Sequence, residues 1–361
     1  MSSSVSTLRY GVIGVGMMGC EHIRNLLALE DCVVVAFADT HEPSRINARK
    51  LVRQATSYVD HREMLKNEQL DVVIIATPNH THRKMLEDVL KTGVHVLIEK
   101  PLCITTNECR QVIEIERKTR KPGRVVWVGL EYRYMAATSR LISEVKSGTC
   151  GSLKMIAIRE HRFPFLQKVD NWNRFSKNTG GTLVEKCCHF FDVMNLLADS
   201  TPVSVYASGA QDVNHLNEIY DGRKSDILDN AFVVVDFENG VRGMLDLSMF
   251  AEGSHNEQEI CVVGDKAKIE AMISDSIVRI GKRVDGRDGV VEISVNQPEG
   301  VVHGFHAGAS FIEHREMQRA IREDGQSTVT LQDGLLSVAI GQAAHLSIAQ
   351  NRSVLIAELF K

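Results

Sequence analysis

The feature that most constrains the fold is a glycine pattern near the start of the chain. Gly14, Gly16 and Gly19 form a Gly-x-Gly-x-x-Gly motif, which follows an apolar, β-branched run at residues 10–13 and opens a helix-like segment. The first glycine permits a tight turn, the second lets backbone approach a pyrophosphate, and the third lets helix and strand pack closely. The motif therefore predicts a Rossmann-type dinucleotide-binding domain, to which we assign residues 1–130.

Apolar runs alternate with amphipathic segments through this region. The runs are short and nearly uninterrupted, as in parallel strands covered on both faces. They lie at residues 10–13, 33–38, 72–76, 94–98 and 125–128. The helix-like segments lie at residues 20–29, 43–53, 61–66, 82–91 and 107–118. This alternation predicts βαβ units and a parallel sheet.

After residue 130 the pattern changes to strand-like segments joined by short turns, one of them the hairpin signal Asn239-Gly240. The predicted strands are residues 154–161, 203–208, 231–237, 241–248, 259–263, 268–271, 277–281 and 290–295. Helices are predicted at residues 181–197, 307–323 and 333–351, and a loop at residues 211–229. The fold class is thus α/β, with a substrate-binding and oligomerisation domain at residues 131–361 that has a large, mainly antiparallel open sheet.

Composition excludes several classes of protein. The chain of 361 residues has a net charge of -4, which favours neither nucleic acid nor an anionic membrane surface. No apolar run approaches the ~20 residues of a membrane helix, and the Ser-rich start does not read as a signal peptide. Eight cysteines without a framework fit free thiols in a reducing compartment. They lie at positions 20, 32, 103, 109, 150, 187, 188 and 261. We therefore expect a cytoplasmic protein.

Asp39 ends the second predicted strand, about 20 residues after Gly19, where an acidic residue bonds the adenosine ribose hydroxyls. Its carboxylate should repel a 2′-phosphate, which favours NAD over NADP. His41 and Arg45 lie near enough to temper that preference.

Polar residues follow the next two predicted strands. In open parallel sheets, ligands bind just beyond the carboxyl ends of the strands. A charged Glu99-Lys100 pair in such a place is hard to explain by packing. Besides the three glycines and Asp39, the residues predicted to bind the cofactor are Met17, Met18, Thr40, Thr77, Pro78, Asn79, His82, Glu99 and Lys100.

The chain resembles the Gfo/Idh/MocA family, which includes glucose–fructose oxidoreductase and inositol dehydrogenases. The resemblance covers nearly the whole chain and rests on five motifs. These are the glycine motif, Thr77-Pro78-Asn79-x-x-His82, Glu99-Lys100-Pro101, Gly180-Gly181-x-Leu183 leading to His189, and Gly341-x-Ala343-Ala344-x-x-Ser347. It implies an NAD(P)-dependent oxidoreductase that moves a hydride between nicotinamide and a secondary alcohol of a sugar, an inositol-like polyol or a sugar acid. It also implies a homodimer or homotetramer formed through the exposed face of the second sheet.

Three residues are predicted to be catalytic. By resemblance, Lys100 binds the reacting oxygen and relays its proton, and His189 is the general acid–base. If Glu185 opens a helix, it lies four residues before His189 on the same face and can orient the imidazole. The family usually has Asp where this chain has Glu185, whose side chain is longer by one methylene.

Arg133, Arg162 and Trp172 are predicted to bind substrate together with His189, because a tryptophan offers a sugar ring an apolar face. With Arg174 and Lys186, the arginines also raise the possibility of an anionic substrate such as a sugar acid. Cys187-Cys188-His189 lacks the separated cysteine pairs of structural zinc sites, so no metal is predicted.

Two other functions stay open. One is a non-catalytic regulator that senses a dinucleotide on the same fold, since a fold does not prove an activity. The presence of both Lys100 and His189 argues against it. The other is a carbonyl reductase similar to the dihydrodiol dehydrogenases.

Overall fold

The computed structural model describes residues 6–361 except 299, 302, 303, 305 and 324, so residues 1–5 of the Ser-rich start lie outside it. Packing groups the chain into two compact units. Unit 1 consists of Met1–Cys103, Glu108–Leu130 and Gly300–Leu335. Unit 2 consists of Ile104–Asn107, Glu131–Glu299 and Leu336–Lys361. Each unit is described by itself.

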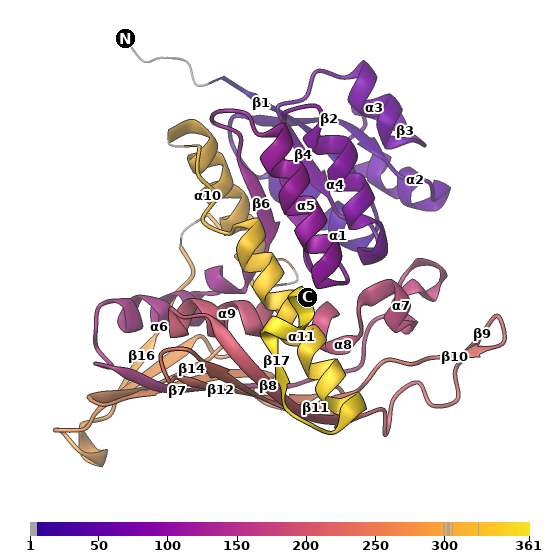
Figure 1. Cartoon of the computed structure of the whole chain (residues 1–361). Coiled ribbons are helices and arrows are strands. Elements are labelled where there is room, and N and C mark those ends of the chain that lie inside the picture. Colours follow the sequence, from indigo (N-terminus) through magenta and orange to yellow (C-terminus); the bar gives the residue numbers. More distant parts are fainter. Residues whose placement is uncertain (1–5, 299, 302–303, 305, 324) are drawn as a thin grey trace, which may run out of the picture. The chain divides into compact units, whose positions relative to one another are not determined.

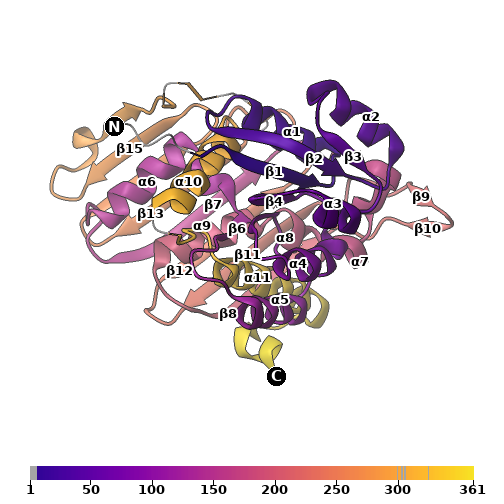
Figure 2. The same ribbon diagram turned by 90° about the horizontal axis from the view of Figure 1, so that it is seen from above.

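Unit 1 contains a six-stranded sheet in the order β3-β2-β1-β4-β5-β6, with every neighbouring pair parallel. Its strands are β1 (Leu8–Ile13), β2 (Cys32–Ala38), β3 (Thr56–Tyr58), β4 (Val72–Ile75), β5 (His95–Glu99) and β6 (Val126–Gly129). In Figure 2, β2, β1 and β4 run side by side. This is the doubly wound order of dinucleotide-binding domains, and it confirms the predicted Rossmann fold.

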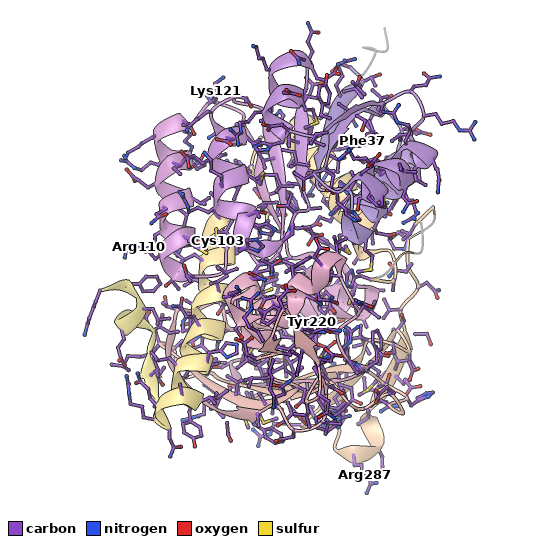
Figure 3. All side chains as sticks on the ribbon, turned by 90° about the vertical axis from the view of Figure 1, so that its right-hand side faces the viewer. Phe37, Cys103, Arg110, Lys121, Tyr220 and Arg287 are labelled. Atoms are coloured by element: carbon purple, nitrogen blue, oxygen red, sulfur yellow. The ribbon has the colours of Figure 1, made fainter. Side chains whose placement is uncertain are left out.

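The helices of unit 1 alternate with these strands. They are α1 (Met17–Leu27), α2 (Glu42–Leu51), α3 (His61–Asn67), α4 (His82–Leu90) and α5 (Thr106–Thr119), the last of which starts in unit 2. The central strands are apolar because both faces are covered, and Phe37 of β2, which is labelled in Figure 3, is fully buried. The short strand β3 was not predicted, because three residues are too few to form an apolar run.

Helix α10 (Ala309–Glu323) packs on α1 and belongs to unit 1, although its position in the sequence predicted it in the second domain. Trp127 of β6 donates a hydrogen bond from Nε1 to Oε1 of Glu313 on this helix, at 3.1 Å. Nothing local in the sequence signals this return, because it depends on which apolar face the helix covers.

Unit 2 contains a nine-stranded sheet in the order β16-β15-β14-β13-β7-β12-β11-β8-β17. Of its pairs only β7–β12 is parallel, so the predicted, mainly antiparallel open sheet is confirmed. The strands are β7 (Leu153–His161), β8 (Pro202–Ala210), β11 (Asn230–Phe237), β12 (Arg242–Ser248), β13 (Gln258–Gly264), β14 (Ala267–Met272), β15 (Ile277–Lys282), β16 (Val291–Ser294) and β17 (Val354–Leu355).

Helices cover one face of this sheet, among them α6 (Ala136–Lys146), α9 (Cys188–Ala198) and the unit 2 part of α11 (Leu331–Gln350) (Figure 1). Helix α6 was not predicted. The predicted loop at residues 211–229 contains a small hairpin, β9 (Ile219–Tyr220) and β10 (Arg223–Lys224).

The other face of the sheet carries exposed apolar side chains. Tyr206, Val234 and Met244 are paired across β8, β11 and β12 in one row, and all three are exposed. Phe232, two residues along β11, is 61% exposed. This is a larger apolar surface than isolated exposed residues would make.

No helix among the described residues is both long and apolar enough to cross a membrane.

Candidate active site

The three motif glycines each have the geometry that a dinucleotide cradle requires. Gly14 has a φ of 84°, and a Cβ there would lie 2.6 Å from the carbonyl oxygen of Ala76. A Cβ on Gly19 would lie 1.9 Å from the carbonyl oxygen of Gly14, so only glycine lets helix and turn pack this closely. A Cβ on Gly16 would meet nothing within 4 Å. Backbone is therefore open to a ligand at the N-terminus of α1, as pyrophosphate binding needs.

Asp39 follows β2 and lies beside this cradle. Its Oδ2 accepts a hydrogen bond from the amide of Val15, and its Oδ1 accepts one from the amide of His41, both at 2.8 Å. Each carboxylate oxygen has two lone pairs, so acceptor capacity remains for ribose hydroxyls. The Arg45 guanidinium donates to the carbonyl oxygens of Asp39 and Thr40, at 2.7 and 3.0 Å. Arg45, the cation that would favour a 2′-phosphate, is thus already hydrogen-bonded to backbone carbonyl oxygens.

The segment after β4 is held by His82, the first residue of α4. Its Nδ1 lies 2.8 Å from the carbonyl oxygen of Pro101, and its Nε2 lies 3.0 Å from that of Thr77. His82 is fully buried, and it ties the loop after β4 to the loop after β5. Thr77 Oγ1 is within 2.7 Å of Thr81 Oγ1, and Asn79 is buried in the same turn. His82 therefore supports the loops of the predicted cofactor site from the protein interior, and its ring is not on the surface of that site.

Glu99 and Lys100 lie at the carboxyl end of β5. Glu99 is buried, and its Oε1 lies 2.9 Å from Nε2 of His22 on α1. Its Oε2 accepts a hydrogen bond from the Lys100 amide at 3.1 Å. Lys100 itself is half-buried. Of the predicted pair, the lysine is the member whose side chain is more accessible.

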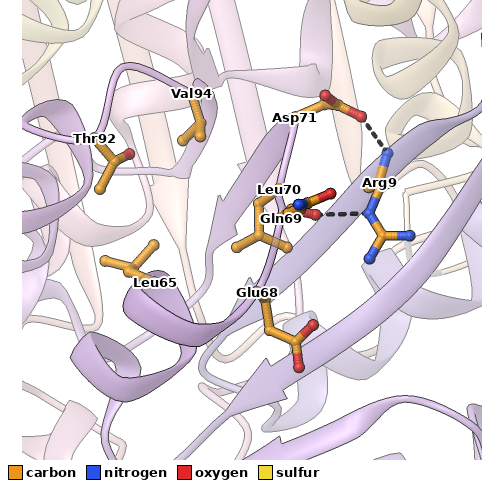
Figure 4. A pocket seen from close by; sticks show the side chains of 8 residues that line it. All are labelled: Arg9, Leu65, Glu68, Gln69, Leu70, Asp71, Thr92 and Val94. Carbon is orange, nitrogen blue, oxygen red and sulfur yellow. Dashed lines mark hydrogen bonds between the residues drawn. The ribbon is translucent and has the colours of Figure 1, made fainter.

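A separate cavity of about 390 Å³ lies at the other end of this sheet, where its strands begin (Figure 4). It is lined by residues that precede β4 and β5 and by Arg9, whose amide and Nε donate to Asp71 and to the Gln69 carbonyl. Since it adjoins the amino ends of the strands, it is not the predicted cofactor site.

In unit 2, Gly180 and Gly181 both have positive φ, 84° and 87°, and lead into α8 (Thr182–Glu185). His345 of α11 supports this turn, because its Nε2 accepts a hydrogen bond from the Leu183 amide at 3.1 Å. Burial lowers the pKa of His345 to about 4, so its ring is a neutral acceptor at pH 7. A Cβ on Gly341 of the same helix would lie 2.4 Å from the Leu183 carbonyl oxygen. The closing helix motif therefore serves close packing against the glycine turn.

The predicted single helix at residues 181–197 is wrong. Helix α8 ends at Glu185, and α9 begins at Cys188, so the helix is interrupted at residues 186–187. No glycine or proline at residues 186–187 signals this break. The pairing of Glu185 with His189 is thus not supported by a continuous helix, and it stays a prediction.

His189 lies against residues that directly follow β6. The ring of Tyr132 stacks on the His189 imidazole, with centroids 4.0 Å apart and planes inclined by 10°. Oε1 of Glu131 lies 3.7 Å from Nε2 of His189, too far for a hydrogen bond but close enough to attract the ring once it is protonated. His189 is 1% exposed. Sequence reasoning missed both partners, although their place immediately after a predicted strand was an available signal.

A fully buried carboxylate, Glu160 of β7, organises the surroundings of Tyr132. Its Oε1 lies 3.0 Å from Lys186 Nζ and 3.3 Å from Nη1 of Arg162. Lys186 also donates to the Tyr132 hydroxyl at 2.8 Å, as does Gln258 at 3.0 Å. Burial, with Glu160 nearby, raises the pKa of Tyr132 well above its ordinary value, so the phenol stays protonated.

The other predicted substrate-binding residues also have partners. Arg133 pairs with buried Asp192 of α9, with Nε 2.6 Å from Oδ2, and Arg174 pairs with Glu218 at 3.1 Å. Trp172 is half-buried in the turn at Val169–Arg174, and Lys168 Nζ lies 5.8 Å from its ring centroid. The arginines that suggested an anionic substrate are thus each matched by a carboxylate.

Among the described residues, no three His, Cys, Asp or Glu side chains are grouped so as to hold a metal ion.

The sheet order and the glycine cradle define a dinucleotide-binding protein of the Rossmann class with an additional α/β unit. Two family models match the chain. One, described as the oxidoreductase family, NAD-binding Rossmann fold, matches residues 8–130, and the other, its C-terminal alpha/beta domain, matches residues 142–356. The chain belongs to the Gfo/Idh/MocA oxidoreductase family.

Similar proteins cover the chain almost completely. A myo-inositol 2-dehydrogenase of Thermotoga maritima is 25% identical over 354 residues, which are 98% of this chain and 99% of that protein. An oxidoreductase domain protein of Kribbella flavida has a TM-score of 0.87 at 19% identity, over 98% of this chain and 100% of that one. A levoglucosan dehydrogenase in complex with NADH has a TM-score of 0.83 at 21% identity, over 97% and 99% of the two chains. At these identities the two solved structures show a shared fold.

Proposed function

We propose that this protein is an NAD-dependent dehydrogenase that acts on a secondary alcohol of an uncharged sugar or inositol-like polyol. The observation that carries the proposal is the setting of His189, a buried imidazole fixed by the Tyr132 ring and faced by the Glu131 carboxylate. An acid–base histidine needs a fixed ring and a nearby charge that stabilises its imidazolium. The named activity of the Thermotoga maritima relative supports the same reaction class.

Lys100 and His189 have complementary roles in this proposal. His189 takes the hydroxyl proton onto its ring, and Glu131 favours the cation that results. The Lys100 ammonium, at the end of β5, opposes the negative charge that develops on the substrate oxygen. No step of this scheme uses Glu185, whose part in orienting the imidazole stays a prediction.

The cofactor choice rests on Asp39. When bound, NAD supplies the acceptor for the hydride. Gly14, Gly16, Gly19 and the amides that open α1 would hold its pyrophosphate, and Asp39 would bond the ribose hydroxyls. A 2′-phosphate would meet this carboxylate, whose neighbour Arg45 is already bonded to backbone carbonyls.

The ion pairs of unit 2 favour a neutral substrate, because a buried carboxylate already contacts each of the cations named below. Asp192 matches Arg133, and Glu160 faces both Lys186 and Arg162. A substrate carboxylate would compete with these buried acidic groups for the same cations. A hydroxyl-rich substrate can donate to the carboxylates without adding charge.

We also propose a homo-oligomer, with a second copy covering the exposed row Tyr206, Val234 and Met244. An isologous contact between two such faces buries the apolar side chains of both copies. Sedimentation at micromolar concentration should give a particle larger than the 40.2 kDa chain, and a monomer would refute this part of the proposal. Free thiols at all eight cysteines agree with a cytoplasmic setting.

The deciding experiment is a fluorescence screen for reduced cofactor, with sugars, polyols and sugar acids tested with NAD and with NADP. With a substrate found, Lys100→Ala and His189→Ala should each lower kcat by ~10²–10⁴-fold. Because both serve one proton transfer, the double variant should lose much less than the product of the two losses. Full turnover in His189→Ala would contradict the proposal. NADH binding without turnover of any substrate would favour the regulator instead.

A further inference from the structure

A chain of three buried side chains runs through unit 1 and ends at Lys100. His314 of α10 and His22 of α1 lie with Nε2 and Nδ1 2.8 Å apart, and both are buried. His22 Nε2 lies 2.9 Å from Glu99 Oε1. The other oxygen of Glu99 accepts the Lys100 amide at 3.1 Å. These side chains join α10, the helix that opens at the glycine motif, and strand β5, which ends at Glu99 next to Lys100.

The hydrogen bond between His22 and Glu99 has a fixed direction. A carboxylate oxygen only accepts, so Nε2 of His22 carries the proton in the bond to Glu99. Burial, with His22 nearby, lowers the pKa of His314 well below its ordinary value, so His314 is neutral at pH 7. Whether His314 donates to Nδ1 of His22 or accepts from it, His22 donates to Glu99.

Stability alone does not account for this arrangement. A buried carboxylate and two imidazoles lose their hydration, and apolar side chains of similar volume would serve packing at least as well. The hydrogen bonds of the two histidines instead fix the rotamer of Glu99. The second oxygen of Glu99 then fixes the Lys100 amide. On the other side, His82 holds the Pro101 carbonyl oxygen. The backbone is therefore hydrogen-bonded at the Lys100 amide and at the carbonyl of the next residue, Pro101.

We propose that His22 and His314 are positioning residues for Lys100, which aim the lysine by way of Glu99 and couple it to the helix of the glycine motif. The inference rests on the proposed function, in which Lys100 acts on the substrate oxygen. Neither histidine needs to contact substrate.

The test compares two amide variants of His22. In His22→Gln the amide nitrogen can occupy the place of Nε2 and donate to Glu99, whereas the shorter side chain of His22→Asn reaches only as far as Nδ1. Loss of a supporting group of this kind typically costs 10–100-fold in activity. His22→Asn should therefore lower kcat by about that factor, with KM and the NADH dissociation constant nearly unchanged, and His22→Gln should restore most of it.

His61 offers a matched control within the same unit. Its Nε2 lies 3.1 Å from Asp88 Oδ2, so it too is a buried histidine paired with a carboxylate, but on α3 and α4. His61→Asn should lower the free energy of unfolding by an amount similar to His22→Asn while leaving kcat unchanged. Equal loss of kcat in the two Asn variants, or equal loss in His22→Gln and His22→Asn, would overturn the inference.

A second measurement needs no turnover. In the protein without cofactor, the rate at which an amine-reactive reagent labels Lys100 should rise several-fold in His22→Asn but not in His22→Gln or His61→Asn. Lys118, whose side chain is 67% exposed on α5, serves as the internal reference. An unchanged rate at Lys100 would overturn the inference.

If Lys100→Ala retains full kcat, the proposed role of Lys100 fails, and the inference falls with it. If only Lys100→Ala loses kcat, the proposed function stands without this inference.

Discussion

The ring of Tyr132 lies face to face with the imidazole of His189, 4.0 Å away between centroids. Its hydroxyl accepts hydrogen bonds from Lys186 and Gln258, so one residue holds the histidine and also ties it to the buried polar cluster. The two functions can be separated by substitution.

Tyr132→Phe keeps the ring and removes the acceptor. Lys186 and Gln258 each lose one partner, which should lower the free energy of unfolding by about 1–3 kcal/mol while kcat falls only slightly. Tyr132→Leu removes the stacked ring as well, and kcat should then fall sharply. Urea unfolding and steady-state kinetics measure the two effects. Equal kcat in both variants would show that the stack does not orient His189.

The buried pair of Arg133 and Asp192 should behave as a unit. Asp192→Leu leaves an arginine side chain that is 9% exposed without its carboxylate, which should cost about 3–5 kcal/mol. Arg133→Met together with Asp192→Leu should be much less destabilising than the sum of the two single variants. A double-mutant cycle of urea unfolding gives the coupling. Additive losses would indicate that the arginine finds another carboxylate.

Replacing Asp39 tests the choice of cofactor. Asp39→Ala removes both the ribose acceptor and the bonds to the amides of Val15 and His41. NADH binding should weaken, and discrimination against NADPH should relax. Fluorescence titration with both reduced cofactors measures this. If the unmodified protein binds NADPH more tightly than NADH, the assignment of NAD is wrong.

His345 should make the glycine turn sensitive to acid. Its pKa is about 4 in the folded protein and near 6.5 when unfolded, so the unfolded chain takes up the proton first as the pH falls. Its contribution is therefore complete above about pH 6.5 and is lost towards pH 4, a change of about 3 kcal/mol. The amide oxygen of His345→Gln can still accept from Leu183 but does not titrate. The difference in unfolding free energy between pH 7 and pH 4.5 should be smaller in this variant, and an unchanged difference would contradict the assignment.

The glycine cradle could be predicted from sequence because its logic is local. Gly14, Gly16 and Gly19 adjoin their own strand and helix, and Asp39 ends the next strand, so spacing alone placed them. The partners of His189 could not be placed this way. Glu131 and Tyr132 lie more than fifty residues earlier in the chain, and only the fold of unit 2 brings them to the histidine. The break between α8 and α9 could not be predicted for the opposite reason, since the local helical pattern continues across residues 186–187, which no glycine or proline marks.

The return of α10 to unit 1 has a consequence for how the molecule is made. The Val128 amide of β6 bonds the Val329 carbonyl oxygen, and Trp127 bonds Glu313, so the last strand of the Rossmann sheet is completed by chain two hundred residues downstream. During synthesis, this unit emerges first from the ribosome and is finished late, after most of unit 2. A fragment cut at residue 130 would leave the α10 side of α1 bare. The two units therefore cannot be separated by a single cut in the chain. An exchange of unit 1 between relatives would have to include residues 300–335.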